Sequence, residues 1–275
     1  MIREIKRIIR AVLETITLLF DYKLSHISSF DTPATSASAI KDLLRQLRPL
    51  AIKQPLIRLG PDGDGGYLIP EDLKGVTACF SPGVSSISGF EMDCADKGIN
   101  VYLADASVDQ PPSESDKFDF IKKYIGQRNS PDFITLEDWV SRKTRGDEGD
   151  LILQMDIEGY EYEALLSCSQ GVLNQFRIIV IEFHNLDMLW SKPFFSLAAS
   201  VFEKILSTHD CVHIHPNNYL MPYEKEGIQI PPLMEFTFLR KDRVVTSNHS
   251  LSFPHPLDFD NTQKTSFSLP QCWYE

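Results

Sequence analysis

The sequence predicts an α/β fold built on a doubly wound parallel sheet. From Val76 onward, strand-like and helix-like segments alternate, as they do where crossover helices connect parallel strands. The run 150–156 is apolar at most positions, as in a strand buried on both faces, and a helical pattern follows it at once. With 275 residues, 43% of them hydrophobic and 24% charged, the chain fits a soluble globular protein.

The first twenty residues predict a basic amphipathic helix. Apolar side chains recur there at helical spacing, with Arg3, Lys6, Arg7 and Arg10 between them. Glu14 interrupts the apolar run and no small-residue cleavage site follows, so a signal peptide is not indicated. The helix is expected to pack on its own domain or on a second subunit, or to lie peripherally on a membrane surface.

A linker and a short helix come next. Residues 26–37 are rich in Ser, Thr and Pro, and residues 38–50 carry leucines on one side until Pro49 ends the helix. We therefore divide the chain into an N-terminal helical extension with a linker (1–50), a main domain (51–246) and an irregular C-terminal tail (247–275).

The main domain is predicted to alternate strands and helices to its end. Gly98 closes the first of its helices, and a polar loop is expected at 106–117. The predicted strands are 76–83, 99–105, a short one near 132–135, 150–156, 177–184, 211–216 and 234–242. The predicted helices are 88–98, 136–143, 161–168 and 194–209. The segment before the last strand looks like a loop, so the last two strands are expected to pair antiparallel at one edge.

Charge and cysteine content exclude several classes of protein. The formal net charge of −11 argues against nucleic acid as a partner, because phosphate binding relies on clustered Lys and Arg. The five cysteines form no CxxC pair, which excludes a zinc ribbon and disfavours a disulfide framework. We expect free thiols in a cytoplasmic protein.

Polar residues stand where the predicted strands end, and ligands of open parallel sheets bind at that edge. Gly83 follows the first strand and allows a ligand to approach the backbone, and Asp105 ends the second strand, where a carboxylate can bind ribose hydroxyls. Gly83 is explained equally by a structural turn, since no GxGxxG is present.

Further ionisable residues end the later strands: Asp156, then Glu182 and His184, then His213 and His215. Each has a structural alternative. Asp156 fits a helix cap, Glu182 a buried partner for an arginine, and the two late histidines a metal pair, a pocket wall or core hydrogen bonds.

A segment rich in Gly and Asp, "RLGPDGDGGYLIP", precedes the first strand. It lacks the spacing of a phosphate loop or a calcium loop. It is either a tight turn or, through Tyr67, one wall of the cleft.

The segments "DGDGGYLIP", "FSPGVSSISGFEMDCADKGINVYLADASVD", "LILQMDIEGYEYEALL", "RIIVIEFHNL" and "CVHIHPNNY" resemble the FkbM-type family of S-adenosylmethionine-dependent methyltransferases over about Arg58 to Arg243. The resemblance implies a Rossmann-like class I methyltransferase sheet of seven strands, one of them antiparallel at the edge. Ser81 and Ser85 stand where the family commonly has an acidic residue and a second glycine.

The resemblance also implies the site and the chemistry. S-adenosylmethionine is expected to contact Gly83, Ser85, Asp105, Ala106 and Asp156. The expected catalytic residues are His184 as base, with Asp156 and Glu182. The expected substrate contacts are Glu158, His213, His215 and Tyr67. A divalent cation, Mg²⁺ or Mn²⁺, has Asp156, Glu182 and His184 as its candidate ligands.

The expected reaction is O-methylation of a hydroxyl on a sugar, a glycan or a related metabolite. Two other classes stay open. The fold can serve as a non-catalytic binding or scaffold protein, or as another nucleotide-dependent enzyme such as a dehydrogenase, against which the missing GxGxxG speaks.

Overall fold

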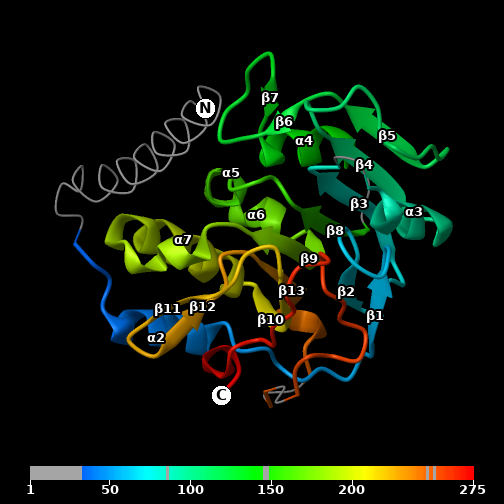
Figure 1. The fold of residues 1–275 in the computed structure, drawn as a ribbon. Helices are drawn as coiled ribbons and strands as arrows, with labels where there is room; N and C mark the ends of the chain where they lie inside the picture. The colour runs from blue at the N-terminus through cyan, green and yellow to red at the C-terminus, as the bar shows by residue number, and fades with distance from the viewer. Residues whose placement is uncertain (1–32, 85–86, 145–148, 246–247, 250–251) are drawn as a thin grey trace, which may run out of the picture.

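A seven-stranded sheet forms the centre of the protein (Figure 1). The structure is a computed structural model and describes residues 33–84, 87–144, 149–245, 248–249 and 252–275. The predicted helix over the first twenty residues and most of the predicted linker lie outside these residues. Ser85, an expected cofactor contact, also lies outside them.

The order of the strands confirms the predicted fold class. Across the sheet the strands are β10 (His209–Pro216), β13 (Met234–Arg240), β9 (Phe176–Phe183), β8 (Asp150–Met155), β3 (Val76–Pro82), β4 (Asn100–Ala104) and β5 (Phe118–Ile121). The strands from β9 to β5 pair in parallel, whereas β13 is antiparallel to both of its neighbours. The last two strands thus form the predicted antiparallel pair at one edge, and the sheet is mixed and Rossmann-like.

Helices and small sheets surround this sheet. The helices are α2 (Ala37–Gln46), α3 (Gly89–Asp96), α4 (Leu136–Lys143), α5 (Glu161–Ser167), α6 (Gln170–Leu173) and α7 (Lys192–Leu206), with short 3-10 turns η1 (Leu186–Trp190), η2 (Lys241–Arg243) and η3 (Gln271–Trp273). The two-stranded sheets are β1 (Leu56–Leu59) with β2 (Tyr67–Pro70), β6 (Tyr124–Ile125) with β7 (Phe133–Ile134), and β11 (Tyr223–Lys225) with β12 (Ile228–Ile230).

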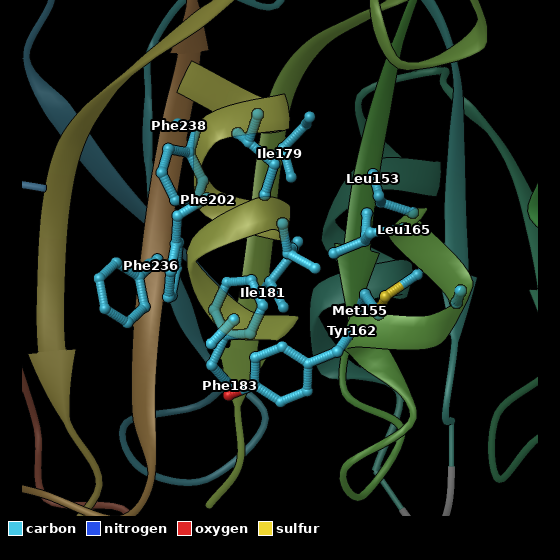
Figure 2. Packing of buried hydrophobic residues seen from close by; sticks show 14 of the residues in the cluster. Leu153, Met155, Tyr162, Leu165, Ile179, Ile181, Phe183, Phe202, Phe236 and Phe238 are labelled. Atoms are coloured by element: carbon cyan, nitrogen blue, oxygen red, sulfur yellow. The ribbon is translucent and has the colours of Figure 1, made fainter. Parts of the chain in front are cut away.

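The sheet buries both faces, as its apolar strands predict. On β9, Ile179, Ile181 and Phe183 pack in one cluster with α4, α5 and α7, while Ile178 and Val180 pack in a second cluster with α3 and the β1–β2 hairpin. Figure 2 shows the first cluster, in which Phe183 lies between β13 and the helices α5 and α7. This alternation follows from the two-residue period of a strand.

Local sequence signals start and orient the helices. Thr135 caps α4 by accepting a hydrogen bond from the Asp138 backbone N–H at 3.1 Å. On α7, Ala198, Val201, Phe202 and Ile205 are buried, which is the spacing of one helical face. The strands β8 and β9 are parallel neighbours, so the polar residues that follow them lie at the same edge of the sheet. We call it the carboxyl edge.

Several expected loops contain strands. The sequence placed no strand at Phe118–Ile121, yet this segment is β5, at one side of the main sheet. The expected short strand near 132–135 is β7, which pairs with β6 outside the main sheet. The segment expected to be a loop before the last strand contains the β11–β12 hairpin, and the Gly-rich segment forms the turn of the β1–β2 hairpin.

The C-terminal residues 252–275 pack across β10 and the β1–β2 hairpin. Asp258 accepts a hydrogen bond from His213 Nε2 at 2.9 Å, and Arg58 lies over the ring of Phe259. Trp273 is fully buried, and its Nε1–H donates to the Gln229 carbonyl oxygen at 3.1 Å. These contacts make the tail part of the core.

All five cysteines are free thiols, as expected. Among the described residues, no helix is both long and apolar enough to cross a membrane.

Candidate functional site

A close backbone contact joins the ends of β3 and β8. Gly83 has φ +89°, and a Cβ atom there would lie 1.6 Å from the Asp156 carbonyl oxygen. The Gly83 N–H donates to the Ala104 carbonyl at 3.0 Å, and the Asp156 N–H donates to the Pro82 carbonyl at 3.3 Å. Glycine is therefore required at 83 both for its dihedral angle and for the missing side chain.

Asp105 follows β4 beside this contact and is buried. Its Oδ1 accepts from the Ser107 N–H at 2.7 Å and from the Ser107 hydroxyl at 2.6 Å. The neighbouring backbone thus fixes the position of the carboxylate at the carboxyl edge.

A cavity of about 500 Å³ lies between the ends of β3, β4 and β8, and we call it the main cavity. Its lining residues are Gly83, Ala104, Asp105, Ser107, Tyr124, Ile125, Phe133, Asp156, Ile157, Glu158 and Tyr160. Gly83, Asp105 and Asp156 meet here as expected. Ala106 is half-buried and does not line the cavity, whereas its neighbour Ser107 does.

The sequence analysis missed one wall of the main cavity. Tyr124, Ile125 and Phe133 come from β6 and β7, and the Tyr124 and Phe133 rings lie 5.4 Å apart between centroids. The available signal was a pair of aromatic residues in an otherwise polar stretch after the strand that was not recognised as β5. These side chains give the cavity an apolar, partly aromatic side.

A smaller chamber of about 70 Å³ shares Gly83 and Asp156 with the main cavity. Its other lining residues are Asp64, Gly65, Tyr67, Val84, Ile87, Glu91 and Gln154. Tyr67 thus forms part of the cleft wall, which was one of the two expectations for the Gly-rich segment. Burial and the carboxylates of Asp156 and Glu182 raise the pKa of Tyr67 well above its ordinary value.

At the floor of this chamber, Ser81 is joined to a carboxyl group from α3. Ser81 Oγ donates to Gln154 Oε1 at 2.8 Å and lies 2.5 Å from Glu91 Oε1. Burial raises the pKa of Glu91. β3 has Ser81 where the family named in the sequence analysis commonly has an acidic residue. In this protein, Glu91 of α3 brings a carboxyl group next to Ser81.

The acidic cluster consists of Asp156, Glu158, Glu161 and Glu182 around the imidazole of His184. His184 Nε2 lies 3.3 Å from Glu158, 3.7 Å from Glu182 and 3.8 Å from Asp156, and Nδ1 lies 3.2 Å from Glu161. Glu158 is well exposed and Glu161 is fully buried. The ends of β8 and β9 and the start of α5 supply all five side chains.

Burial and mutual repulsion shift the protonation of this cluster. Burial raises the pKa of Asp156 to about 7, with a partly opposing effect of His184 and a further rise from Glu158. Burial lowers the pKa of His184, but Glu161, Glu182 and Asp156 outweigh it and bring the value to about 9. In the cluster as it stands, the imidazole is therefore charged at neutral pH, which does not suit the base that the sequence analysis assigned to it.

Two polar residues extend the cluster along the sheet. Glu182 accepts from the Asn217 side-chain amide at 3.1 Å, and its neighbour across the β9–β13 pair is Glu235. Burial raises the pKa of both carboxyl groups. Glu235 was not predicted, because an acidic residue within the apolar run of β13 shows its position only in the sheet register.

One set of potential metal ligands lies in this region. Asp156, Glu161 and His184 each offer an atom, and these atoms lie within 4.8 Å of one another. The predicted set contained Glu182 in place of Glu161.

His213 and His215 lie at a different place. They face Asp258 of the tail, with His213 Nε2 at 2.9 Å and His215 Nδ1 at 3.6 Å from its carboxylate oxygens. His215 lines a cavity of about 320 Å³ between β10 and the tail, and neither histidine lines the main cavity. The structure therefore does not bring them to the His184 cluster.

Comparison with known families gives one match. Residues 91–207 match the family described as the methyltransferase FkbM domain. The match contains Asp105, Asp156 and His184 and leaves out Gly83, so it is narrower than the segment 58–243 identified from the motifs. No curated protein matches the sequence.

Two solved structures share limited likeness. A methyltransferase from an antibiotic biosynthesis pathway of Anabaena variabilis has 11% identity and a TM-score of 0.26, over 54% of this chain and 61% of that one. A tRNA (uracil-54, C5)-methyltransferase of Pyrococcus abyssi in complex with S-adenosyl-L-homocysteine has 13% identity and a TM-score of 0.29, over 67% of this chain and 44% of that one. The chain thus spans less than two thirds of either protein, and the fold class rests on the strand order.

Proposed function

We propose, from the methyltransferase FkbM domain that the chain carries, that it transfers the methyl group of S-adenosylmethionine to a hydroxyl group of a sugar, a glycan or a related metabolite. The observation that carries this proposal is the main cavity, which has Gly83 and Asp105 on one side and opens at Asp156 to the acidic cluster. Cavities of about 300–1,000 Å³ hold ligands of this size class.

The residues of the main cavity fit the cofactor. The buried Asp105 carboxylate suits the ribose hydroxyls, and Tyr124, Ile125 and Phe133 suit the flat face of adenine. Gly83 lines this cavity with its backbone, which is held close to the Asp156 carbonyl oxygen because residue 83 has no side chain. When bound, the cofactor supplies a methyl group on a sulfonium, which is electrophilic.

The acidic cluster and the small chamber suit a hydroxyl-bearing acceptor. Carboxylates accept hydrogen bonds from hydroxyl groups, and Tyr67 and Glu158 stand in the walls. Among the described residues, the carboxylates of the cluster have no ion pair with Lys or Arg, so a phosphorylated or carboxylated acceptor would be repelled. The site therefore favours a neutral polyol.

The chain's task in the reaction is to orient the acceptor oxygen in line with the methyl group and to accept the hydroxyl proton. Asp156 lines both cavities, and Glu182 and Asp156 both lie beside His184 Nε2, at 3.7 and 3.8 Å. We assign to these two carboxylates the acceptance of the hydroxyl proton, and the neighbouring imidazole orients them.

Calorimetric titration of S-adenosylhomocysteine, with excess EDTA present, tests the cofactor. We expect saturable binding of one molecule per chain, and a loss of about tenfold to a hundredfold in affinity for Asp105→Ala, as for removal of a charged hydrogen bond. Asp109→Ala is the matched control, because its side chain is exposed and pairs with Lys122. Folded wild type that binds nothing, or an equal loss in both variants, would contradict the proposal.

Transfer from methyl-labelled S-adenosylmethionine tests the acceptor. Neutral mono- and oligosaccharides are expected to acquire an alkali-stable label, and sugar phosphates are not. Cofactor binding without transfer to any hydroxyl would favour a non-catalytic binding or scaffold protein. Labelling of amines or thiols instead would overturn O-methylation.

We also place the protein in the cytoplasm, for which the five free thiols are the support.

A further inference from the structure

Two buried side chains of the acidic cluster, Glu161 and His184, and the half-buried Asp156 present unpartnered polar atoms to one another. Asp156 follows β8, Glu161 begins α5 and His184 follows β9, and their potential ligand atoms lie within 4.8 Å. Asp156 Oδ1, Glu161 Oε2 and His184 Nδ1 are each buried without a hydrogen-bond partner among the described residues. An unpaired polar atom of this kind destabilises the folded chain, and a charged group does so more strongly.

The Glu161 carboxylate is held in place before any ligand arrives. Its Oε1 accepts from the Ile157 N–H at 3.1 Å and from the Gly159 N–H at 3.0 Å, and no part of its side chain is exposed. Its Oε2 thereby has a fixed direction. Outer hydrogen bonds of this kind orient the carboxylate ligands of metal ions in proteins.

The charge balance also calls for a cation. Among the described residues, His184 is the only basic side chain paired with the four carboxylates, and as a metal ligand its imidazole is neutral. Buried carboxylates are costly unless they are paired or coordinate a metal. Glu158 is exposed to solvent, so the carboxylates that need a partner are those of Asp156, Glu161 and Glu182.

We propose that Asp156, Glu161 and His184 bind a divalent metal ion, with Glu161 in the place that the sequence analysis gave to Glu182. Two carboxylate oxygens and one imidazole nitrogen favour a first-row ion such as Mn²⁺ over Mg²⁺, which prefers oxygen ligands and keeps several waters. Glu182 stays outside the ligand set, beside His184 and bonded to Asn217.

This inference rests on the proposed function for its purpose. Asp156 lines both cavities, so an ion on its carboxylate stands where an acceptor hydroxyl would enter. There it would stabilise the oxygen as its proton leaves, with Glu182 as a buried carboxylate outside the ligand set that can take the proton.

Titration of metal-stripped full-length protein with Mn²⁺, followed by the electron paramagnetic resonance signal of the free ion, tests the site without cofactor or turnover. We expect one ion per chain and an affinity reduced at least tenfold in both Glu161→Gln and His184→Gln. The control is Glu163→Gln, an exposed carboxylate two residues along the same helix. Circular dichroism checks that each variant is folded.

The outcomes separate this inference from the proposed function. The metal site would be overturned if wild type bound no Mn²⁺ at about millimolar concentration. It would also be overturned if Glu161→Gln and His184→Gln bound Mn²⁺ as tightly as wild type and the control Glu163→Gln. S-adenosylhomocysteine binding in EDTA would then still stand as support for the proposed function. If Glu161→Gln fails to fold, the stoichiometry of wild type and the folded His184→Gln variant decide the question.

Discussion

His209 shows how one buried side chain makes stability depend on pH. It is fully buried, with Nε2 2.8 Å from the Phe176 carbonyl oxygen and Nδ1 2.9 Å from Thr208 Oγ1. Burial lowers its pKa from 6.5 to about 4, so the unfolded chain binds more protons between these values. The stability that His209 contributes is present above pH 6.5 and is lost as the pH falls towards 4.

We expect that urea unfolding at about pH 7.5 and about pH 5 will show a smaller pH effect in His209→Gln than in wild type, by about 2 kcal/mol. Glutamine keeps a donor for the Phe176 carbonyl but does not titrate. The exposed His249→Gln should behave as wild type. An equal loss of stability on acidification in wild type and His209→Gln would rule out this origin.

Single residues of the site were predictable where strand ends reveal them. Gly83, Asp105, Asp156 and His184 each follow an apolar strand, and the topology rule for open sheets brings them to one edge. Glu161 was not among the predicted site residues, because its contact with His184 depends on how α5 leaves the sheet. Its chemistry is therefore visible only in three dimensions.

The strands β8, β9 and β13 are joined at their other ends by an ion-pair network. Arg177 Nε donates to Asp150 at 2.7 Å, and its Nη1 donates to the Asp72 and Lys74 carbonyl oxygens at 2.8 and 2.7 Å. Arg240 also donates to Asp150 at 2.7 Å. Arg177 is nearly fully buried, so its removal leaves Asp150 and two carbonyl groups without this partner.

We expect Arg177→Met to lower the free energy of unfolding by about 3–5 kcal/mol, as for one partner of a buried ion pair. Arg142→Met removes an exposed pair with Asp138 and should cost less than about 1 kcal/mol. Denaturant unfolding measures both. Since the network lies at the end of the sheet away from the main cavity, S-adenosylhomocysteine affinity should be equal in wild type and Arg177→Met.

Long, apolar elements were predicted from the sequence, whereas several short, partly exposed strands were not. The strands β8 and β9 are nearly continuous apolar runs, and α7 repeats its apolar side chains at helical spacing. In contrast, β5 has four half-buried residues, and β11 is mostly exposed. Such strands form because a partner strand offers hydrogen bonds, β4 for β5 and β12 for β11, and a local sequence pattern does not report that partner.

The tail completes the core of the whole molecule. Trp273 packs edge-on against Phe236 of β13 at 5.9 Å between ring centroids, and η3 lies against α2. We expect Trp273→Ala to lower the free energy of unfolding by about 3–5 kcal/mol, as for other buried aromatic residues. Leu257→Ala, at an exposed tail position, should change it by less than about 0.5 kcal/mol. Thermal unfolding that is equally affected by both would show that the tail is not part of the core.

The backbone contact between Gly83 and Asp156 bears on inhibitor design. The main cavity and the small chamber share these two residues, so groups bound in the two cavities would be neighbours. Consider a compound in which a short linker joins an adenosine-like group, for the main cavity, to a hydroxylated group, for the small chamber. Once the first group is bound, binding of the second group becomes intramolecular. Such linkage raises affinity by about 10²–10⁴ over either group alone when the geometry allows both contacts. The carboxyl edge of this sheet is therefore a natural target for bisubstrate compounds.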